Sequence, residues 1–316
     1  MARPPAPSHS TVTDLALAVV GDQRLASALT QIARDVDAGF DALLPVPQDA
    51  RARLIEAMRY AAIGGGKRIR PLLLTATAEL YGGDRHTAVR AGLAIEAIHV
   101  YSLIHDDLPC MDDDATRHGK PTVHRQFDEA TAVLAGDALH AFAFEVLADP
   151  AMSGDPFTRA ELVAALAGAS GAQGMAGGQM MDMVAEVADF DLQTITRLQQ
   201  LKTGALLGAA VEMGAILGRV PPEGRTHLRG YARDIGLAFQ IADDLLDHEG
   251  DAASAGKAVG KDAAAGKATF VSLLGPDRAR EQARMLVEQA VTQLGQHGEE
   301  AGVLRALARY IVERDH

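Results

Sequence analysis

An apolar stripe at helical spacing is the first strong pattern along the chain. Apolar residues recur at steps of three and four, at Leu25, Leu29, Ile32, Val36, Phe40 and Leu43. Positions spaced in this way lie on one face of an α-helix, so the segment is predicted to be an amphipathic helix. Pro45 and Pro47 follow it, and proline cannot continue a helix because it lacks the amide N–H. The helix is therefore expected to end before Pro45.

The same periodicity recurs along the rest of the chain. It predicts helices at about 52–63, 71–81, 87–108, 130–148, 156–172, 190–217, 223–247, 277–295 and 299–314. Glycine and proline gather where helices should end, as in Gly64-Gly65-Gly66 and Pro221-Pro222. We find no series of alternating strands bounded by hairpin turns. The pattern predicts an all-α fold in which a loose tail, 1–20, precedes a single domain at 21–316.

Composition and charge narrow the functions that such a fold could have. The 316 residues carry 30 Lys and Arg against 42 Asp and Glu, a net charge of −12. This balance argues against nucleic-acid binding, which needs a basic surface, but allows a phosphorylated small substrate if metal ions mediate. The single cysteine, Cys110, cannot form an intrachain disulfide, and the N-terminus lacks the apolar core of a signal peptide. The longest apolar stretch, 204–218, is interrupted by Glu212 and is short for a bilayer. We expect a cytoplasmic protein without an integral membrane segment.

Two clusters of aspartates stand out against apolar helices. The first is HDDLPCMDDD at 105–114, and the second lies within FQIADDLLD at 239–247. Each lies near the C-terminal end of a predicted helix, where the helix dipole disfavours negative charge. A bound cation would remove this conflict. A solvated acidic helix end explains one such pair well, but two similar clusters indicate a functional site.

The spacing within the clusters suits a metal ion. Asp243 and Asp247 are four residues apart and share one helix face. Asp106 and Asp112 are six residues apart and would lie on different faces of an unbroken helix. Pro109 lies between them, and a bulge around it would return Asp112 to the side of Asp106. Clusters of oxygen ligands suit Mg²⁺, which also keeps waters and binds substrate phosphates.

Candidate phosphate-binding cations lie elsewhere in the chain. Lys67, Arg68 and Arg70 follow a glycine run and precede a helix whose first position suits Pro71. Glycine allows close backbone approach, while lysine and arginine bind phosphate; a solvated basic loop fits this segment equally well. Lys202 lies within an apolar helix and therefore needs an anionic partner.

Together these motifs resemble those of the trans-isoprenyl diphosphate synthases, the polyprenyl synthetase family, and most closely the bacterial farnesyl diphosphate synthases. In order, the motifs are GGGKRIRP, HVYSLIHDDLPCMDDD, GKPTVH, LAGDAL, GGQ, KTGAL and GLAFQIADDLLD, with Gly-Lys pairs downstream. Any one of them is weak, but the ordered set is specific and spans about 25–314. The resemblance implies an isoprenoid synthase-type helical bundle around a central cavity, usually assembled as a homodimer.

The resemblance also implies roles for individual residues. The metal-binding set would be Asp106, Asp107, Asp112, Asp243 and Asp247, with Asp244 in support. The diphosphate of isopentenyl diphosphate would be held by Lys67, Arg70 and His99. The diphosphate of the allylic substrate would be held by Arg117, Lys202 and Lys257. Thr203 and Gln240 would turn their oxygens toward the developing allylic cation. The expected cofactor is Mg²⁺, as three ions per site, with Mn²⁺ as the alternative.

The implied reaction is a head-to-tail condensation. Metal ions and cationic side chains stabilise the allylic diphosphate as it leaves, and Asp106, Asp243 and Lys202 contribute to this step. The double bond of isopentenyl diphosphate then attacks the carbocation, and loss of a proton completes the reaction. Apolar cavity walls keep water away from the cation.

Two positions bear on substrate and product. His118 follows Arg117 where the family has a second arginine that binds isopentenyl diphosphate; histidine is shorter and only partly charged, and Lys120 is a possible substitute. Ser102 and Tyr101 lie four and five residues before Asp106, about one helical turn away. The resemblance associates an aromatic residue here, together with the Pro109-Cys110 insertion, with a C15 product. The alternative is that Tyr101 only packs against a neighbouring helix.

Three other functions are alternatives to farnesyl diphosphate synthesis. A geranylgeranyl or geranyl diphosphate synthase would differ in product length. A class I terpene cyclase normally carries Asn, Ser or Thr, and Glu in its second metal motif, and needs no second diphosphate pocket. A non-catalytic prenyltransferase subunit would be expected to have lost aspartates, whereas both clusters are intact here.

Overall fold

The computed structural model describes residues 22–185, 187–249 and 269–313, and helices make up most of these ranges. The predicted N-terminal tail, 1–20, lies outside the described residues, and so does Lys257. The first half of the bundle consists of α2 (Gln23–Leu43), α3 (Ala52–Ala62), α4 (Ile69–Leu80), α5 (Arg85–Asp106), α6 (Val123–Gln126), α7 (Glu129–Ala148) and α8 (Pro156–Ser170). The second half consists of α9 (Met175–Val184), α10 (Leu192–Gln199), the π-helical turn η1 (Gln200–Gly204), α11 (Ala205–Leu217), the 3₁₀ turn η2 (Pro222–Arg225), α12 (Thr226–Glu249), α15 (Phe270–Leu274), α16 (Pro276–Gln293), the 3₁₀ turn η3 (Glu299–Ala301) and α17 (Gly302–Glu313). The all-α prediction is confirmed.

Aspartates set the starting points of several helices. Asp22, Asp84, Asp128, Asp155 and Asp191 each accept a hydrogen bond from a backbone N–H in the first turn of the helix that follows. A side-chain oxygen here satisfies one of the amides that has no partner within the helix. These caps explain why the observed starts of α2, α5, α7, α8 and α10 fall close to the predicted ones.

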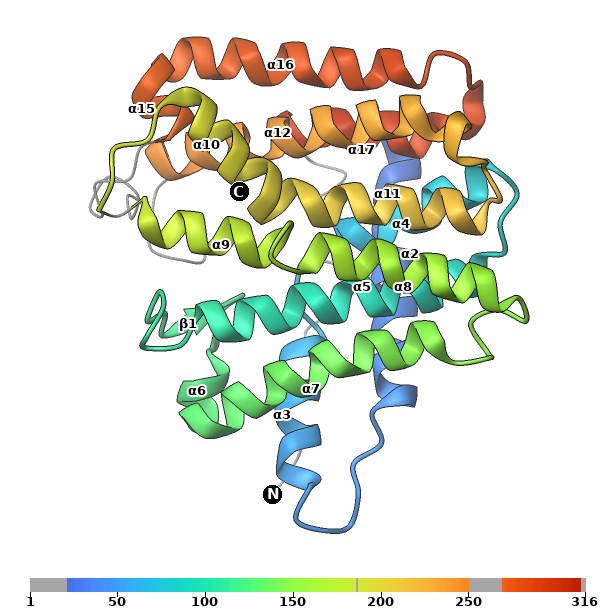
Figure 1. Ribbon diagram of the computed structural model, residues 1–316, viewed down its shortest axis with the longest axis vertical. Coiled ribbons are helices and arrows are strands. Elements are labelled where there is room, and N and C mark those ends of the chain that lie inside the picture. Colours follow the sequence, from blue (N-terminus) through green and yellow to red (C-terminus); the bar gives the residue numbers. More distant parts are fainter. Residues whose placement is uncertain (1–21, 186, 250–268, 314–316) are drawn as a thin grey trace.

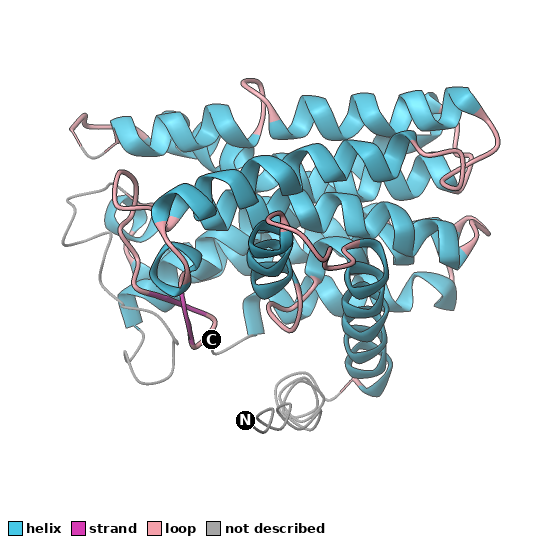
Figure 2. Cartoon of the chain, turned by 90° about the horizontal axis from the view of Figure 1, so that it is seen from below, coloured by secondary structure: helices cyan, strands magenta, loops and turns pink. Residues whose placement is uncertain are grey.

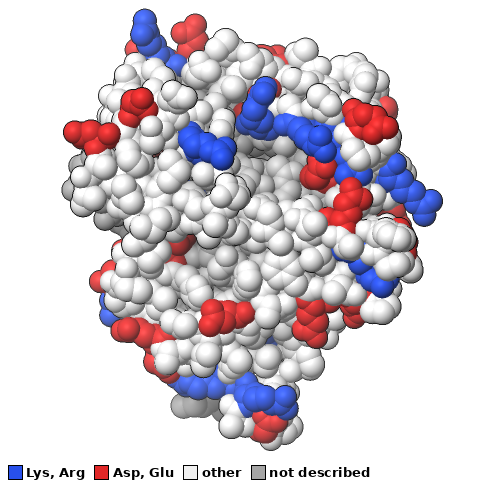
Figure 3. All heavy atoms as spheres, in the orientation of Figure 1, with Lys and Arg blue, Asp and Glu red and all other residues white. Residues whose placement is uncertain are grey.

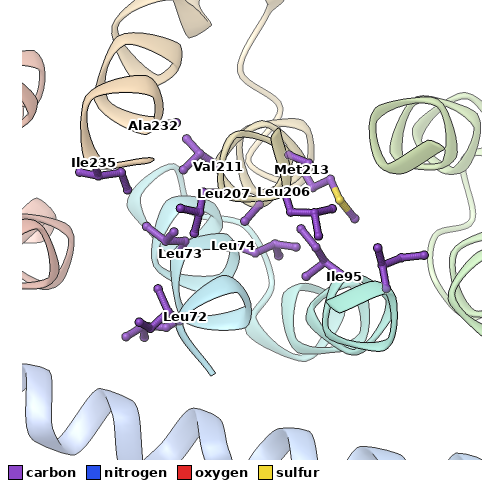
Figure 4. Packing of buried hydrophobic residues seen from close by; sticks show 14 of the residues in the cluster. Leu72, Leu73, Leu74, Ile95, Leu206, Leu207, Val211, Met213, Ala232 and Ile235 are labelled. Atoms are coloured by element: carbon purple, nitrogen blue, oxygen red, sulfur yellow. The ribbon is translucent and has the colours of Figure 1, made fainter. Parts of the chain in front are cut away.

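The helices stack in layers, and α4, α5, α11 and α12 form the middle of the molecule (Figure 1). The side chains of Leu73, Leu74 and Leu206 are fully buried where α4 meets α11, and Ile95 of α5 joins them (Figure 4). α7 lies beside α5, and α16 lies along α12. α2 and α3 run across the other helices and are seen almost end-on in Figure 2. This packing fixes the positions of the end of α5 and the start of α4. The candidate site is built from these two segments.

Two helices, α5 and α7, are long and apolar enough to cross a membrane by length and composition. In the bundle, 61% and 50% of their most apolar windows are buried inside the protein. The core helix of a water-soluble bundle has the same composition, so this feature is weak evidence for membrane insertion.

Three local features differ from the sequence-based prediction. The predicted helix at 190–217 is interrupted at Gln200–Gly204 by the π-helical turn. α9 was not predicted, because Gly174, Gly177 and Gly178 at its start suggest a loop. Within the described residues, the strand content is one antiparallel hairpin of two-residue strands, β1 (Thr116–Arg117) and β2 (Lys120–Pro121). All three features contain residues of the candidate site or lie beside them.

Candidate active site

The first aspartate cluster forms a closed loop at the end of α5. The helix ends at Asp106, and the chain turns so that the N–H of Asp112 donates to the carbonyl of Asp106 at 2.8 Å. The N–H of Asp113 donates to the carbonyl of Leu108 at 3.1 Å. The predicted bulge around Pro109 is therefore present, and it brings Asp112 back beside Asp106.

The electrostatics of this loop suit a bound cation. Burial raises the pKa of Asp106 to about 6, and the neighbouring carboxylate of Asp112 adds to the increase. The ammonium of Lys202 acts in the opposite direction and lowers that pKa. Converging, partly desolvated carboxylates repel each other, so an oxygen-binding cation such as Mg²⁺ fits this loop. In the part of the chain that the structure describes, no group of three or more His, Cys, Asp or Glu side chains forms a complete metal site.

Asp107 turns away from this pair and binds Arg117. Its buried carboxylate accepts a hydrogen bond from Nε of Arg117 at 2.7 Å and lies 2.6 Å from Nη2. Asp114 lies 3.3 Å from the same guanidinium nitrogen. Arg117 is thereby held on β1, next to the aspartate loop. The Asp107 carboxylate thus positions a predicted substrate-binding arginine.

The second aspartate cluster lies near the C-terminal end of α12. Asp243 is close enough to Arg70 of α4 to raise the pKa of that guanidinium. Asp244 is buried, and its carboxylate accepts the N–H of Phe270 at 2.8 Å, which anchors the start of α15. Gln240 lies one helical turn before Asp243 on the same helix. The two neighbouring aspartates of α12 therefore have different surroundings. Asp244 anchors the start of α15, while Asp243 lies near the predicted phosphate-binding cations.

The glycine-rich loop before α4 is held by Arg68. This residue has a left-handed backbone, with φ of 51°, and its side chain is 2% exposed. Its guanidinium donates to Glu96 and Asp37, both at 2.8 Å, and to the carbonyl of Ala62 at 2.6 Å. Buried arginines are rare unless they are paired in this way. The Arg68 side chain therefore holds the glycine-rich loop in place. In the sequence it lies between Lys67 and Arg70, the two cations predicted to bind phosphate.

Those cations belong to a cluster of positive groups. Burial lowers the pKa of His99 well below its usual value, and the nearby charges of Arg70, His118 and Arg117 lower it further. Burial also lowers the pKa of Arg70, while the carboxylates of Glu96 and Asp243 raise it. The Nζ atom of Lys67 lies 5.8 Å from the centre of the Tyr310 ring on α17. Cations crowded in this way favour a polyanion between them.

His118 faces this cluster from the turn of the hairpin. Its backbone is left-handed, with φ of 50°, and Gly119 continues the turn with φ of 73°. A side-chain atom placed on Gly65 would lie 3.6 Å from the His118 ring, and one on Gly64 would lie 3.8 Å from Nζ of Lys120. Burial lowers the pKa of His118, and the charge of Arg117 lowers it further, so the ring is mainly neutral at neutral pH. His118 and Lys120 therefore both lie over the glycine-rich loop.

Lys202 is positioned by the π-helical turn and by α9. Its Nζ donates to Asp182 of α9 at 2.8 Å, which is the anionic partner that its apolar surroundings require. Gly178 lets α9 approach closely, because a Cβ there would lie 2.1 Å from the backbone nitrogen of Lys202. Thr203, the next residue, is buried in the same turn. π-turns within helices are frequently found at functional sites.

Tyr101 packs against α7. Its ring meets the rings of His140 and His105 edge-on, at 5.0 Å and 5.8 Å between centroids. Burial raises the pKa of Tyr101, and the charge of Asp106 contributes. Ser102 donates to the carbonyl of His99 within α5. Tyr101 thus contacts a neighbouring helix and also lies within electrostatic reach of Asp106 in the first aspartate cluster.

The structure brings most of the predicted site residues into one region, at the end of α5, the start of α4, the hairpin and the C-terminal half of α12. Sequence reasoning did not identify the roles of Arg68, Asp182 and Gly178. Asp182 could have been found, because it lies three residues after Gln179 in the GGQ motif, one helical turn further on. Arg68 holds the glycine-rich loop through a left-handed backbone conformation, which the sequence does not indicate.

A separate hollow lies on the face shown in Figure 3, between α8, α11 and α12. This cavity of about 480 Å³ is lined mainly by alanine and glycine, with Glu212, Arg229 and Arg233 among its polar residues. None of the described site residues lines it.

The comparisons with known proteins agree with this geometry. The family model for polyprenyl synthetase matches residues 51–310, so the chain belongs to the polyprenyl synthetase family. The chain is 44% identical to a farnesyl diphosphate synthase of Haemophilus influenzae, over 92% of this chain and 98% of that protein. It is 45% identical to a chloroplastic geranylgeranyl pyrophosphate synthase of Catharanthus roseus, over 84% of this chain and 74% of that one. A solved apo structure of an FPP/GFPP synthase from Zymomonas mobilis is 58% identical and superposes with a TM-score of 0.84, covering 92% and 99% of the two chains.

Proposed function

We propose that this chain is a short-chain trans-prenyltransferase that condenses isopentenyl diphosphate with dimethylallyl and geranyl diphosphates to give farnesyl diphosphate and pyrophosphate. The observation that carries the proposal is that a closed aspartate loop at Asp106 and Asp112 lies beside a cluster of basic side chains that includes Arg70, Arg117 and His99. A protein that handles two diphosphates needs both features: carboxylates for metal ions and cations for phosphate oxygens.

The residues present fit Mg²⁺. Asp106, Asp112 and Asp243 would hold it, and their oxygen-only donor set is the one that Mg²⁺ prefers in proteins. When bound, Mg²⁺ supplies positive charge that stabilises a diphosphate leaving group. Mn²⁺ has similar ligand preferences and is the alternative.

The side chains of the chain supply the remaining chemistry. Lys67, Arg70 and His99 bind and orient the diphosphate of isopentenyl diphosphate, while Arg117 and Lys202 hold that of the allylic substrate. Because the pKa of His99 is lowered, its imidazole is neutral and contributes hydrogen bonding rather than charge. Arg68 keeps the glycine-rich loop in place, so that Lys67 and Arg70 are preorganised before substrate arrives. Thr203 and Gln240 place oxygens near the reacting carbon.

Farnesyl diphosphate is proposed as the main product because Tyr101 places a bulky ring about one turn from Asp106, where it packs edge-on against His140. The relatives include both farnesyl and geranylgeranyl synthases, so product length depends on details of this kind. We further propose a cytoplasmic homodimer. The exposed apolar side chains of Val133 and Leu134 on α7, 41% and 56% accessible, support a second subunit there.

Alanine substitution of the two aspartate clusters tests this function. Asp106→Ala and Asp243→Ala should each lower turnover of the two C5 diphosphates by several orders of magnitude, while the circular dichroism spectrum stays helical. Glu281→Ala is the matched control, because this exposed carboxylate on α16 is outside the proposed site and should leave turnover unchanged. Near-normal activity in either cluster variant would contradict the metal assignment.

A further inference from the structure

A second polar cluster lies at the opposite end of the helices that carry the candidate active site. Tyr81 directly follows α4, His227 lies in the first turn of α12, and His297 lies in the connection between α16 and η3. Along the helix axes, Tyr81 is about 16 Å from Arg70 and His227 is about 24 Å from Asp243, at about 1.5 Å per residue. The cluster is therefore separate from the site of prenyl transfer.

The polar atoms of this cluster lie close together. The Nε2 atoms of His227 and His297 are 3.3 Å apart. Oη of Tyr81 is 2.9 Å from the first and 3.0 Å from the second. The side-chain amide of Gln296 closes the group, at 2.7 Å from Nε2 of His227 and 3.4 Å from Nε2 of His297. Four side chains from three parts of the chain thus bring nitrogen or oxygen atoms together around the two histidine Nε2 atoms.

We propose that this cluster is a binding site for a divalent transition metal of the Zn²⁺ type, with His227 and His297 as the principal ligands. Zinc–nitrogen bonds are about 2.0–2.1 Å long, so two ligands at the tetrahedral angle stand about 3.3–3.4 Å apart. The observed separation of the two Nε2 atoms, 3.3 Å, equals this value. Tyr81 supplies the third donor through its oxygen. A half-turn of the Gln296 amide places its oxygen where the nitrogen now lies, which completes four positions.

The chemistry of the two histidines suits a metal site. Imidazole binds a metal through the lone pair of one ring nitrogen, and metal-binding histidines usually donate their other N–H to a carbonyl or a carboxylate. The carboxylate of Glu300 lies within electrostatic reach of His297 and favours a cation there, while the guanidinium of Arg305 opposes it.

The position of the cluster predicts what the metal would do. It would tie the end of α4 and the start of α12 to the link between α16 and α17. A ligand that binds only the folded protein stabilises it by mass action. Metal binding here should therefore raise the melting temperature, and it should not change the rate of condensation, because the aspartate clusters lie at the other ends of these helices.

Titration with zinc tests the proposal. The purified protein, free of any polyhistidine tag and held in excess Mg²⁺ to occupy the aspartate clusters, should bind one equivalent of Zn²⁺ by isothermal calorimetry. His227→Asn and His297→Asn should each weaken this binding more than about tenfold, since even the partners of metal ligands are worth 10–100-fold. His86→Asn is the matched control, because His86 is exposed on α5 and outside the cluster.

A second measurement keeps the proposal testable if a variant does not fold. Cu²⁺ bound to the wild-type protein in excess Mg²⁺ should show coupling to imidazole nitrogens in its electron paramagnetic resonance spectrum. The proposal is overturned if Zn²⁺ binds the wild type no more tightly than it binds the His227→Asn or His297→Asn protein. It is also overturned if Cu²⁺ shows no nitrogen ligands. Either result would leave the cluster as a hydrogen-bonded contact between helix ends.

Discussion

His118 lies where the family resemblance implies a second arginine, and in the structure it lies beside the predicted isopentenyl diphosphate site. Its ring lies over the glycine-rich loop, within electrostatic reach of Arg68 and Arg117. Because burial and these neighbours lower its pKa, the ring carries little charge at neutral pH. The position therefore supplies a hydrogen bond where an arginine would supply a permanent charge.

Replacing this histidine should strengthen substrate binding. We expect His118→Arg to lower the KM for isopentenyl diphosphate severalfold at pH 7–8, since a hydrogen bond to a charged group is worth roughly 1.5–3 kcal/mol at most. The KM for the allylic substrate should stay unchanged. The advantage should shrink as the pH falls, because a histidine with a lowered pKa gains its charge only in acid. Steady-state kinetics at pH 6 and pH 8 measure both effects; an unchanged KM for isopentenyl diphosphate would show that Lys120 already fills this role.

The sequence identified the charged residues of the site more readily than the residues that hold them. Asp106, Arg70 and Lys202 are recognisable because charge beside or within apolar helix is costly and therefore conspicuous. Arg68 looks identical to its neighbours in sequence, yet its left-handed backbone directs it into a buried network with Glu96. That difference arises from packing between α4 and α5, which no local pattern reveals.

At the scale of elements, periodicity predicted the long helices and missed the places where helices meet closely. α9 begins in a glycine-rich segment that looks like a loop, but there Gly178 allows backbone contact with the π-helical turn. The interruption of the helix at Gln200–Gly204 leaves the apolar pattern nearly intact, so it gives no signal in the sequence. Both features depend on tertiary packing rather than on local propensity.

A pair of glycine substitutions tests this contact. Gly178→Ala would place a Cβ 2.1 Å from the nitrogen of Lys202, so α9 or the π-turn must move. We expect a loss of about 1–3 kcal/mol in the free energy of unfolding, as for other overpacked sites, and a fall in kcat as Lys202 shifts. Gly168→Ala on α8 is the matched control, because no atom lies within 4 Å of its Cβ. It should stabilise the protein by up to about 1 kcal/mol and leave kcat unchanged.

Urea denaturation and steady-state kinetics on the two variants provide the comparison. Equal effects from Gly178→Ala and Gly168→Ala would mean that α9 adapts freely, and that its close approach does not position Lys202.

At the scale of the whole molecule, product length should follow from how far the prenyl chain can extend from the aspartate loop into the bundle. Tyr101 lies about one turn from Asp106 and is supported by His140 of α7. Tyr101→Ala removes a ring from this position and leaves room for roughly one more isoprene unit. We expect its main product to shift from C15 toward C20 or longer. A variant that still stops at C15 would show that Tyr101 only packs against α7 and that the floor of the cavity lies elsewhere.

Product analysis of the unmodified protein tests the central claim most directly. The purified chain, without any partner protein, is incubated with isopentenyl and dimethylallyl diphosphates and Mg²⁺, and the products are separated by chain length after removal of the diphosphate. We expect farnesol as the main alcohol released, and no condensation when Mg²⁺ is chelated. Formation of a hydrocarbon from added farnesyl diphosphate, or failure to condense the two C5 substrates, would contradict prenyltransferase function. A predominantly C20 product would contradict its assignment to farnesyl diphosphate synthesis.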